Sequence, residues 1–455
     1  MESSISGGRS ASGEGFDALL ERAVSEINDG MVPVEIFAHA GIFDAELSRI
    51  FARCWVFLGF EAEIPNSGDF MQRKIGRDSV IVTRDSKSEI HVLANFCRHR
   101  GTRLCDADIG NQSRFRCPYH GWVFKNNGDW IGAPDRSKAY AGTDTRQWDL
   151  LRAPRVETFL GMIFASLDPD APTLEDYLGG AGWMMRGLLD LHPDGMVPIG
   201  QPDRYRVHGD WKTGADNFGG DVYHVGVAHG SIQTIGLAQG FDTLNDHSTH
   251  YVLGGGHSFL GHDFDTLFGE AGHLWYYDPA VRSHFDLSRL DPLLQEVVKK
   301  NPPIVGTIFP NLSFLRFFGA PSPDEPPTVY TMWRLWQPVG PGEMELWSWQ
   351  MKWSFMDERE AAACYQAGMY GFGPAGIFEQ DDTVIWSGAP EVARSTWARQ
   401  AKASFNLQMG INGLGQQQQD TNWAGPGEIF RPGPGEPSQR AFYRHWIERM
   451  REERV

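Results

Sequence analysis

The chain has 455 residues, of which 41% are hydrophobic and 12% are aromatic, enough for roughly two or three domains with sizeable cores. Its 41 basic and 58 acidic residues give a formal net charge of −17, which argues against nucleic acid or an anionic membrane surface as a partner. No apolar run reaches the length of about 18 residues that a membrane-spanning helix needs.

The first predicted elements are helices. Residues 1–15 are rich in serine and glycine and lack the charged and apolar regions of a signal peptide, so we expect a disordered tail. From Phe16 to Ile27 apolar residues recur at helical spacing. A second helix is predicted to begin at Asp44, as its N-cap, and to end near Cys54.

Short strands separated by Gly, Asp and Asn turns follow from Trp55 to Leu167, which indicates an all-β domain. Residues 168–172 contain two prolines and mark a boundary. Beyond it the patterns predict a mixture of helices and strands, and hence an α+β domain. The expected helices are 174–191, 357–370 and 439–451, the expected strands are 203–212, 329–337 and 345–354, and residues 416–419 are expected to form a loop.

Two Cys-His pairs stand in turns of the β-rich region. Cys97 and His99 form C-x-H, and Cys117 and His120 form C-x-x-H. Two thiolates and two imidazoles are what a [2Fe–2S] centre needs when histidines replace cysteines on one iron. Structural zinc is the alternative, but zinc motifs usually keep two cysteines close together, and C-x-H is a poor zinc spacing.

The other three cysteines show no pairing pattern. We expect Cys54, Cys105 and Cys364 to be buried, reduced thiols, which is typical of a cytoplasmic protein. Cys105 is near enough to Cys97 to raise the question of a third thiolate ligand. Because the two Cys-His pairs already supply four ligands, we expect Cys105 to be a packing residue.

A second constellation has the spacing D-x-x-H-x₄-H. On a helix Asp221 and His224 would share a face, but His224 and His229 would point about 140° apart. Both histidines can reach one ion only if the helix bends or unwinds, which Gly226 would permit. Two histidines with one distant carboxylate form the triad that holds non-haem Fe(II).

The Cys-His pairs resemble the loops of Rieske proteins. Respiratory members carry an additional disulfide where this chain has Thr102 and Tyr119, so the low-potential kind found in oxygenases and their ferredoxins is indicated. A chain of this length is too long for a ferredoxin, which needs about 100 residues.

Over nearly its whole length the chain resembles the α subunits of Rieske non-haem iron aromatic-ring-hydroxylating dioxygenases of the naphthalene, biphenyl and polycyclic-arene type. The resemblance is carried by the stretch 217–221, by the histidine motif and by the tail at 439–446. It implies that Asp221 bridges a cluster histidine of one subunit and an iron histidine of its neighbour, in a ring of three α subunits. It also implies that Asn217 lies close to the iron.

The third iron ligand is implied to lie in the segment 373–382. Spacing alone leaves Glu379, Asp381 and Asp382 open, and the resemblance selects Asp382. A competing interpretation is that Asp381 or Asp382 caps the helix that leads to Trp386.

A substrate pocket is implied by five apolar positions that match pocket positions of the family, although an aromatic stripe often belongs to a core. They are Phe218, Val305, Leu315, Phe372 and Phe378. The stretch 302–306 lacks the histidine that several members carry there. An aromatic acid would need a buried cation, for which Arg204, Arg206 and Arg316 are the candidates, although surface or structural ion pairs are the ordinary role of such arginines.

The resemblance implies three segments: N-terminal helices at 1–53 that belong to the catalytic domain, a Rieske domain at 54–168, and a catalytic domain at 169–455. The catalytic domain is expected to wrap an antiparallel sheet around helices, as in helix-grip (START/Bet v 1-like) folds. The implied cofactors are the [2Fe–2S] cluster and mononuclear Fe(II), with O₂ as cosubstrate.

The implied reaction inserts both atoms of O₂ into a polycyclic or biphenyl-like arene to give a cis-dihydrodiol. Electrons are expected from NADH through a reductase and a ferredoxin, and the expected assembly is α₃β₃, with α₃ as the alternative. Rival hypotheses are a monooxygenase, a dioxygenase of salicylate- or phthalate-like acids, and a pure electron carrier.

Overall fold

The computed structural model describes residues 14–236, 244, 246–322, 325–412, 417–431 and 433–452. The tail expected at residues 1–15 therefore lies outside the described residues except for its last two positions. Within these ranges no helix is long and apolar enough to span a lipid bilayer.

The N-terminal segment begins with the predicted amphipathic helix, α1 (Phe16–Asn28). The second predicted helix is displaced: α2 spans Ala40–Glu46 and continues as a π-helical turn, Leu47–Phe51. The prediction that Asp44 is the N-cap was wrong. His39 caps α2 by accepting from the Ile42 N–H at 3.2 Å, and Asp44 pairs with Arg77 instead.

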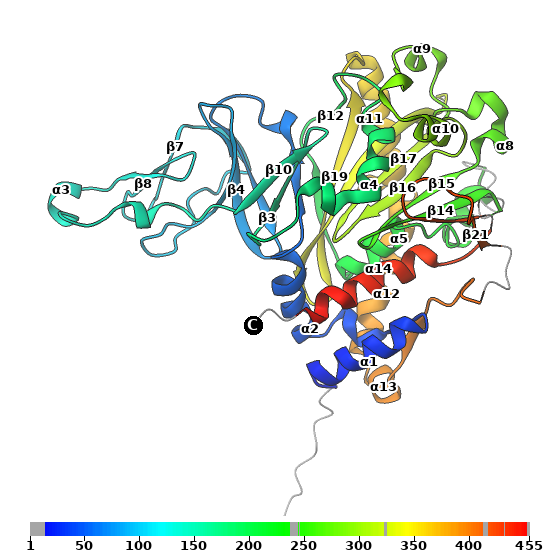
Figure 1. The fold of residues 1–455 in the computed structure, drawn as a ribbon, viewed down its shortest axis with the longest axis horizontal. Helices are drawn as coiled ribbons and strands as arrows, with labels where there is room; N and C mark the ends of the chain where they lie inside the picture. Colours follow the sequence, from blue (N-terminus) through cyan, green and yellow to red (C-terminus); the bar gives the residue numbers. More distant parts are fainter. Residues whose placement is uncertain are drawn as a thin grey trace, which may run out of the picture.

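The β-rich region consists of small antiparallel sheets, β5-β4-β3-β6, β7-β8-β9 and β10-β11-β2. The short strands expected between Trp55 and Leu167 are confirmed, with β4 and β11 among them. Its elements are β2 (Val56–Phe60), β3 (Asp69–Ile75), β4 (Asp78–Arg84), β5 (Ile90–Ala94), β6 (Ile109–Asn111), β7 (Arg114–Arg116), β8 (Val123–Lys125), β9 (Trp130–Gly132), α3 (Arg136–Ala139), β10 (Arg155–Phe159) and β11 (Met162–Ser166). Figure 1 shows β7, β8 and α3 projecting to the left, away from the rest of the molecule.

The larger region is built on one antiparallel sheet with the order β12-β19-β18-β17-β16-β15-β14-β22-β21, to which β13 is added beside β19. Its longest strand, β18, is buried almost throughout. The strands are β12 (Met196–Pro198), β13 (Asp203–Val207), β14 (Ser248–Gly254), β15 (His257–His262), β16 (Pro303–Ile308), β17 (Leu312–Gly319), β18 (Thr328–Gly340), β19 (Glu343–Trp353), β21 (Gln418–Gln419) and β22 (Glu428–Arg431).

Two strand predictions need correction. The strand expected at 203–212 ends at Val207, because Asp210 accepts from the Lys212 N–H and begins a helix there. Gln418 and Gln419 were expected in a loop but form the short strand β21 beside β22. The predicted strands 329–337 and 345–354 are confirmed as β18 and β19.

Helices cover the sheet, and α5 and α11 lie against its central strands β17 and β18 (Figure 1). The predicted helices 174–191, 357–370 and 439–451 are confirmed as α4, α11 and α14. The helices are α4 (Leu174–Leu189), α5 (Trp211–Phe218), α6 (Val225–Ala228), α7 (Gly230–Thr234), α8 (Phe264–Phe268), α9 (Pro279–Arg282), α10 (Pro292–Lys300), α11 (Glu358–Phe372), α12 (Glu379–Arg394), α13 (Thr396–Ala401) and α14 (Pro437–Arg451). The N-terminal segment joins this region, since α1 packs on α14 and β1 (Met31–Pro33) pairs with β20 (Ser404–Asn406).

Candidate active site and metal centres

The two Cys-His loops have the same backbone construction. In the first, the Cys97 N–H donates to Thr102 O at 2.8 Å and the Gly101 N–H donates to Cys97 O at 2.9 Å. In the second, Cys117 repeats this pattern with the residues at 122 and 121. Gly101 and Gly121 have φ of +73° and +68°, which is why glycine stands at this position in both turns.

The loops bring the four candidate cluster residues together. The rings of His99 and His120 lie 4.5 Å apart between centroids, and His99 stacks on Trp122 at 5.0 Å. Among the described residues the buried Nδ1 atoms of both histidines have no hydrogen-bond partner. Burial, together with the neighbouring Cys117 thiol, raises the pKa of Cys97 to about 11. Buried thiols opposite two unpartnered imidazole nitrogens are the donor set that a metal cluster with two sulfur and two nitrogen ligands requires.

The remaining cysteines are buried and free. The Cys105 thiol donates to Ala107 O at 3.6 Å, and the Asn95 side chain binds the backbone on both sides of Cys105. This position in the small core beneath the loops agrees with the packing role expected for Cys105.

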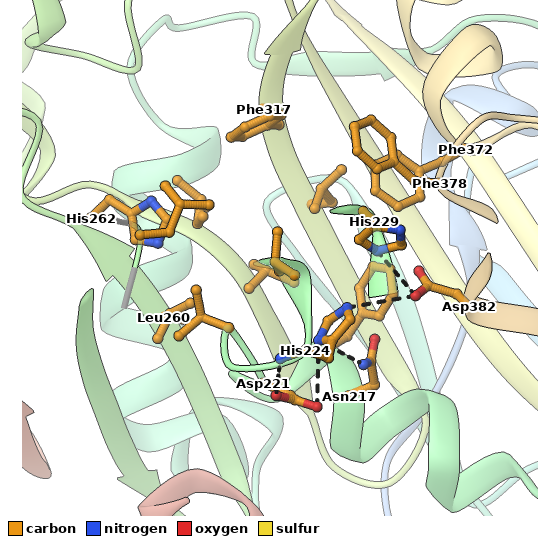
Figure 2. A pocket seen from close by; sticks show the side chains of 17 residues that line it. Asn217, Asp221, His224, His229, Leu260, His262, Phe317, Phe372, Phe378 and Asp382 are labelled. Carbon is orange, nitrogen blue, oxygen red and sulfur yellow. Dashed lines mark hydrogen bonds and ion pairs between the residues drawn. The ribbon is translucent and has the colours of Figure 1, made fainter. Parts of the chain in front are cut away.

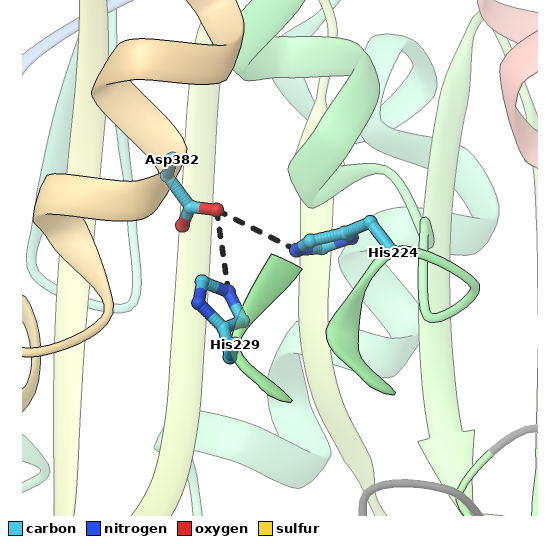
Figure 3. Close-up of side chains that lie close together, drawn as sticks. All are labelled: His224, His229 and Asp382. Carbon is cyan, nitrogen blue, oxygen red and sulfur yellow. Dashed lines mark ion pairs between the residues drawn. The ribbon is translucent and has the colours of Figure 1, made fainter. Parts of the chain in front are cut away.

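The second motif is not one continuous helix. His224 and His229 flank the short helix α6, one at each end, and Asp221 lies in the turn before it. The expected interruption of the helix is present, although Gly226 lies within α6 and is not where the chain bends. The chain leaves the helix at both histidines instead, and their side chains can then face the same point (Figure 3).

The carboxylate that meets both histidines is Asp382. Its Oδ1 lies 3.5 Å from Nε2 of His224 and 3.3 Å from Nε2 of His229. One donor atom from each of these three residues lies within 4.8 Å of the others. Asp382 is in the first turn of α12, and no aspartate caps this helix, since its N-cap is Phe378 without a side-chain bond.

Nδ1 of each histidine faces a different carboxylate. Asp221 Oδ2 lies 3.4 Å from Nδ1 of His224 and Asp381 Oδ2 lies 3.1 Å from Nδ1 of His229. Asn217 Nδ2 also lies 3.4 Å from Nδ1 of His224. Such outer partners fix the ring orientation of metal-binding histidines.

The electrostatics of the triad follow from this arrangement. Burial opposes protonation of His224, but its hydrogen bonds with Asp221 and Asp382 prevail and raise its pKa to about 10. Burial alone would raise the pKa of Asp382, whereas its hydrogen bonds with His224 and His229 lower it to about 2. The carboxyl group is therefore a carboxylate at neutral pH, as a metal ligand must be.

A cavity lined mainly by apolar side chains opens beside the triad (Figure 2). The rings of Phe372 and Phe378 stack at 5.1 Å between centroids, and Phe378 meets His229 edge-on at 5.1 Å. All five expected pocket residues line the cavity. They are Phe218, Val305, Leu315, Phe372 and Phe378.

The three candidate arginines do not reach the cavity. Arg204 pairs with Asp108 at the surface, and Arg206 is exposed. Arg316 lies between Leu315 and Phe317 on β17, both of which line the cavity, so its side chain points to the opposite face. There it donates to a backbone carbonyl and packs on an indole ring.

Sequence reasoning missed two polar side chains of this region. The sequence offers Asp381 only as a ligand or a cap, whereas in the structure its Oδ2 accepts a hydrogen bond from Nδ1 of His229 at 3.1 Å. His262, at the end of β15, lines the cavity and was not considered. The sequence signal was a histidine two residues after Leu260 in a buried strand, but only the fold shows that this strand lines the cavity.

Two family models match the chain. The Rieske [2Fe-2S] domain matches residues 54–155, and the ring hydroxylating alpha subunit (catalytic domain) matches residues 199–452. The first match supports the cluster over structural zinc. The second covers the histidine motif and Asp382, which an electron carrier alone would not need.

Relatives match over nearly the whole length. The N,N-dimethyl phenylurea N-demethylase subunit alpha of Sphingobium sp. (strain YBL2) is 41% identical over 96% of this chain and 95% of its own length. The biphenyl 2,3-dioxygenase subunit alpha of Rhodococcus jostii (strain RHA1) is 33% identical over 95% and 92%. The solved structure of naphthalene 1,2-dioxygenase from Rhodococcus sp. bound to indole has a TM-score of 0.87 at 35% identity, covering 95% of this chain and 97% of that one. The chain therefore belongs to the α subunits of ring-hydroxylating oxygenases, with a Rieske [2Fe–2S] domain and a non-haem iron catalytic domain.

Proposed function

We propose that this α subunit is the terminal oxygenase of a multicomponent system and adds both atoms of O₂ to a neutral polycyclic or biphenyl-like arene, giving a cis-dihydrodiol. The observation that carries the proposal is the meeting of His224, His229 and Asp382 at the wall of an apolar cavity. Similarity to biphenyl and naphthalene dioxygenases supports the same reaction.

We propose that Cys97 and Cys117 hold one iron of the cluster and that His99 and His120 hold the other. The buried Nδ1 atoms of the two histidines, which have no partner among the described residues, support this assignment. The domain division at 54–168 and 169–455 is proposed with it, and the pairing of β1 with β20 supports assigning residues 1–53 to the catalytic domain.

We propose His224, His229 and Asp382 as the ligands of the mononuclear iron. When bound, Fe(II) in such a triad supplies O₂ activation, for which the cluster supplies stored electrons. Other side chains orient the ligands and accommodate the substrate. Asp221 and Asp381 orient the two imidazole rings. The stacked rings of Phe372 and Phe378 form a flat apolar wall that suits an aromatic substrate.

Electron transfer is proposed to run between subunits, with Asp221 as the bridge and Asn217 beside the iron. Figure 1 shows β7 and β8, which bracket the second cluster loop, far from α5 in the same chain. Tyr119, beside the outer cluster histidine, is 58% exposed and Tyr223, beside Asp221, is 56% exposed. Two exposed tyrosines next to the two centres support contact between neighbouring α subunits.

The family's oxygenase components receive electrons from ferredoxin and reductase, and we propose NADH as the source. An α₃β₃ assembly is proposed, with α₃ as the alternative. The five free cysteines support a cytoplasmic location.

An aromatic acid is a poorer substrate for this cavity. Its lining, as far as the structure describes it, includes no lysine or arginine. The sequence from 237 to 245 contains neither residue type. Because a buried carboxylate needs a cationic partner, a neutral substrate fits better.

A second candidate reaction is oxidative N-demethylation of a neutral aryl urea. The 41% identity with the phenylurea N-demethylase α subunit favours it. In this reaction one oxygen atom enters the N-methyl carbon, which leaves as formaldehyde, and the other is reduced to water with the two supplied electrons.

Products formed under ¹⁸O₂ separate the two reactions. The loaded enzyme, with NADH, reductase and ferredoxin, is offered naphthalene, biphenyl and N,N-dimethyl-N′-phenylurea. A cis-diol with both oxygens labelled supports dioxygenation, whereas loss of the N-methyl group with formaldehyde supports the second candidate. If no probe is oxygenated although both metal centres are filled and reducible, the proposal is refuted.

A further inference from the structure

His262 lies at the end of β15 and faces the substrate cavity. Leu260 and His262 are two residues apart on this strand, so they point to the same side, and both line the cavity. Figure 2 shows His262 beside Leu260, across the cavity from His229 and Asp382. The imidazole is therefore placed at the end of the cavity remote from the iron ligands.

His262 differs from the other buried histidines of this sheet. His257 uses both ring nitrogens, one accepting from the Phe309 N–H and one donating to Tyr177 O, each at 3.0 Å. His250 has Ser438 Oγ at 3.2 Å from its Nδ1. His262 is only 1% exposed, yet neither of its ring nitrogens has a partner among the residues that the structure describes.

The protonation state of His262 defines what it can bind. Burial, with a smaller effect of His247 and His250, lowers its pKa to about 3. The ring is therefore neutral, with one N–H donor and one acceptor nitrogen. Such a group is costly to bury without a partner, and a polar group bound in the cavity would offset that cost.

We propose that His262 is a specificity-determining residue that hydrogen-bonds an uncharged polar group of the substrate, so that the preferred substrates are neutral arenes carrying a ketone, amide or urea carbonyl. The inference deepens the proposed function and rests on it, because it takes this cavity as the substrate site. The position of His262 places the polar group away from the carbon that is oxidised. A plain hydrocarbon fits the apolar walls but leaves the imidazole unpaired.

A matched pair of ligands tests this on the unaltered protein. The probes are 1-phenylpropan-1-one and 2-phenylbut-1-ene, in which a methylene group replaces the carbonyl oxygen at nearly the same shape. Dissociation constants are measured on the metal-loaded protein without reductant, so that no turnover occurs. We expect the ketone to bind about tenfold more tightly, the usual worth of one hydrogen bond. Equal binding of the two probes would overturn the proposal.

Two variants test whether the imidazole of His262 causes the preference for the ketone. In His262→Phe the preference should disappear, whereas His262→Gln, which keeps a donor and an acceptor, should retain part of it. Phe317→Leu is the control, because it changes an apolar part of the same cavity and should leave the ratio unchanged. If the ketone still binds more tightly than the alkene by the same factor in His262→Phe, the proposal is overturned. If His262→Phe does not fold, the preference measured in His262→Gln tests the proposal instead.

The recognition role of His262 and the proposed function of the enzyme are distinguished by separate measurements, of binding and of turnover. If the ketone preference holds but no probe is oxygenated, the recognition role stands and the proposed function falls. If probes are oxygenated but the ketone preference is absent, the recognition role falls alone.

Discussion

The two histidines of the triad divide their ring nitrogens between two tasks. Nε2 of His224 and of His229 faces Asp382, while Nδ1 of each faces a second carboxylate, Asp221 or Asp381. The spacing of the motif and the family resemblance predicted the three residues that meet. They could not predict the role of Asp381, because 152 residues separate it from His229 and only the packing of α12 brings them together.

Replacing Asp381 tests this orienting role. Asp381→Asn keeps the shape of the side chain but removes the charge that fixes the His229 ring. We expect the affinity for Fe(II) to fall about 10- to 100-fold, as measured by titrating iron into the iron-depleted protein. Glu391→Gln, an exposed position on the same helix, is the control. Unchanged affinity in Asp381→Asn would show that His229 does not depend on this carboxylate.

Asp221 is proposed to carry a different role, between subunits. Asp221→Asn should keep the cluster spectrum, and also the iron content, because Asn217 still lies 3.4 Å from Nδ1 of His224. It should slow oxygenation by about tenfold or more, because the polar link to His224 is weakened. The rate of cluster reoxidation after reduction, with substrate and O₂ present, measures this step. Turnover at the normal rate in the variant would remove the bridging role.

At the scale of elements, α12 is held in place by a buried ion pair. Arg334 on β18 lies 2.5 Å from Glu379 in the first turn of α12, and both side chains are fully buried. Arg334 also donates to Phe372 O at 2.9 Å, and Tyr205 donates to Glu379. This network fixes the turn that presents Asp382.

Breaking that pair should be costly. Glu379→Gln leaves the Arg334 charge buried without a carboxylate, so the free energy of unfolding should fall by about 3–5 kcal/mol. The exposed pair of Arg77 with Asp44 provides the control, since Asp44→Asn should cost less than about 1 kcal/mol. Urea unfolding followed by tryptophan fluorescence compares them, and equal losses in both variants would contradict this account of α12.

Sequence periodicity predicted α1, α4, α11 and α14 because each buries one face. It placed the second helix wrongly, since Asp44 is a good cap by type but its carboxylate pairs with Arg77 in the fold. The strand expected at 203–212 was predicted too long for the converse reason. Asp210 caps α5, so the strand ends before this residue. Boundaries depend on which partner a polar side chain finds, and periodicity does not show that.

For the whole molecule, the sequence predicted a β-rich domain with two Cys-His loops and a larger α+β domain. It could not show the order of the long sheet, in which β14 to β19 and the late strand β22 come together. Nor could it show that β15 lines the cavity, because the sequence does not reveal which strands the sheet brings beside the histidine motif.

Buried neutral histidines make stability depend on pH. Burial lowers the pKa of His250 and His257 to about 4, and that of His262 to about 3. Between about pH 6.5 and 4 the unfolded chain binds these protons and the folded chain does not, so stability falls as pH falls, by at most ~1.4 kcal/mol per pH unit for each group. Urea midpoints at pH 6.5 and 5.5 measure this. The stability of His262→Phe should depend less steeply on pH than that of the unaltered protein. An equal or steeper pH dependence would contradict the low pKa of His262.

We propose that one chain carries two separate metal centres, a cluster and a lone iron. The most direct measurement is the iron content and visible spectrum of His224→Ala beside those of the unaltered protein. We expect an unchanged and reducible Rieske spectrum, two iron atoms per chain in place of three, and no oxygenated product. Loss of the cluster spectrum in this variant, or an iron content equal to that of the unaltered protein, would contradict it.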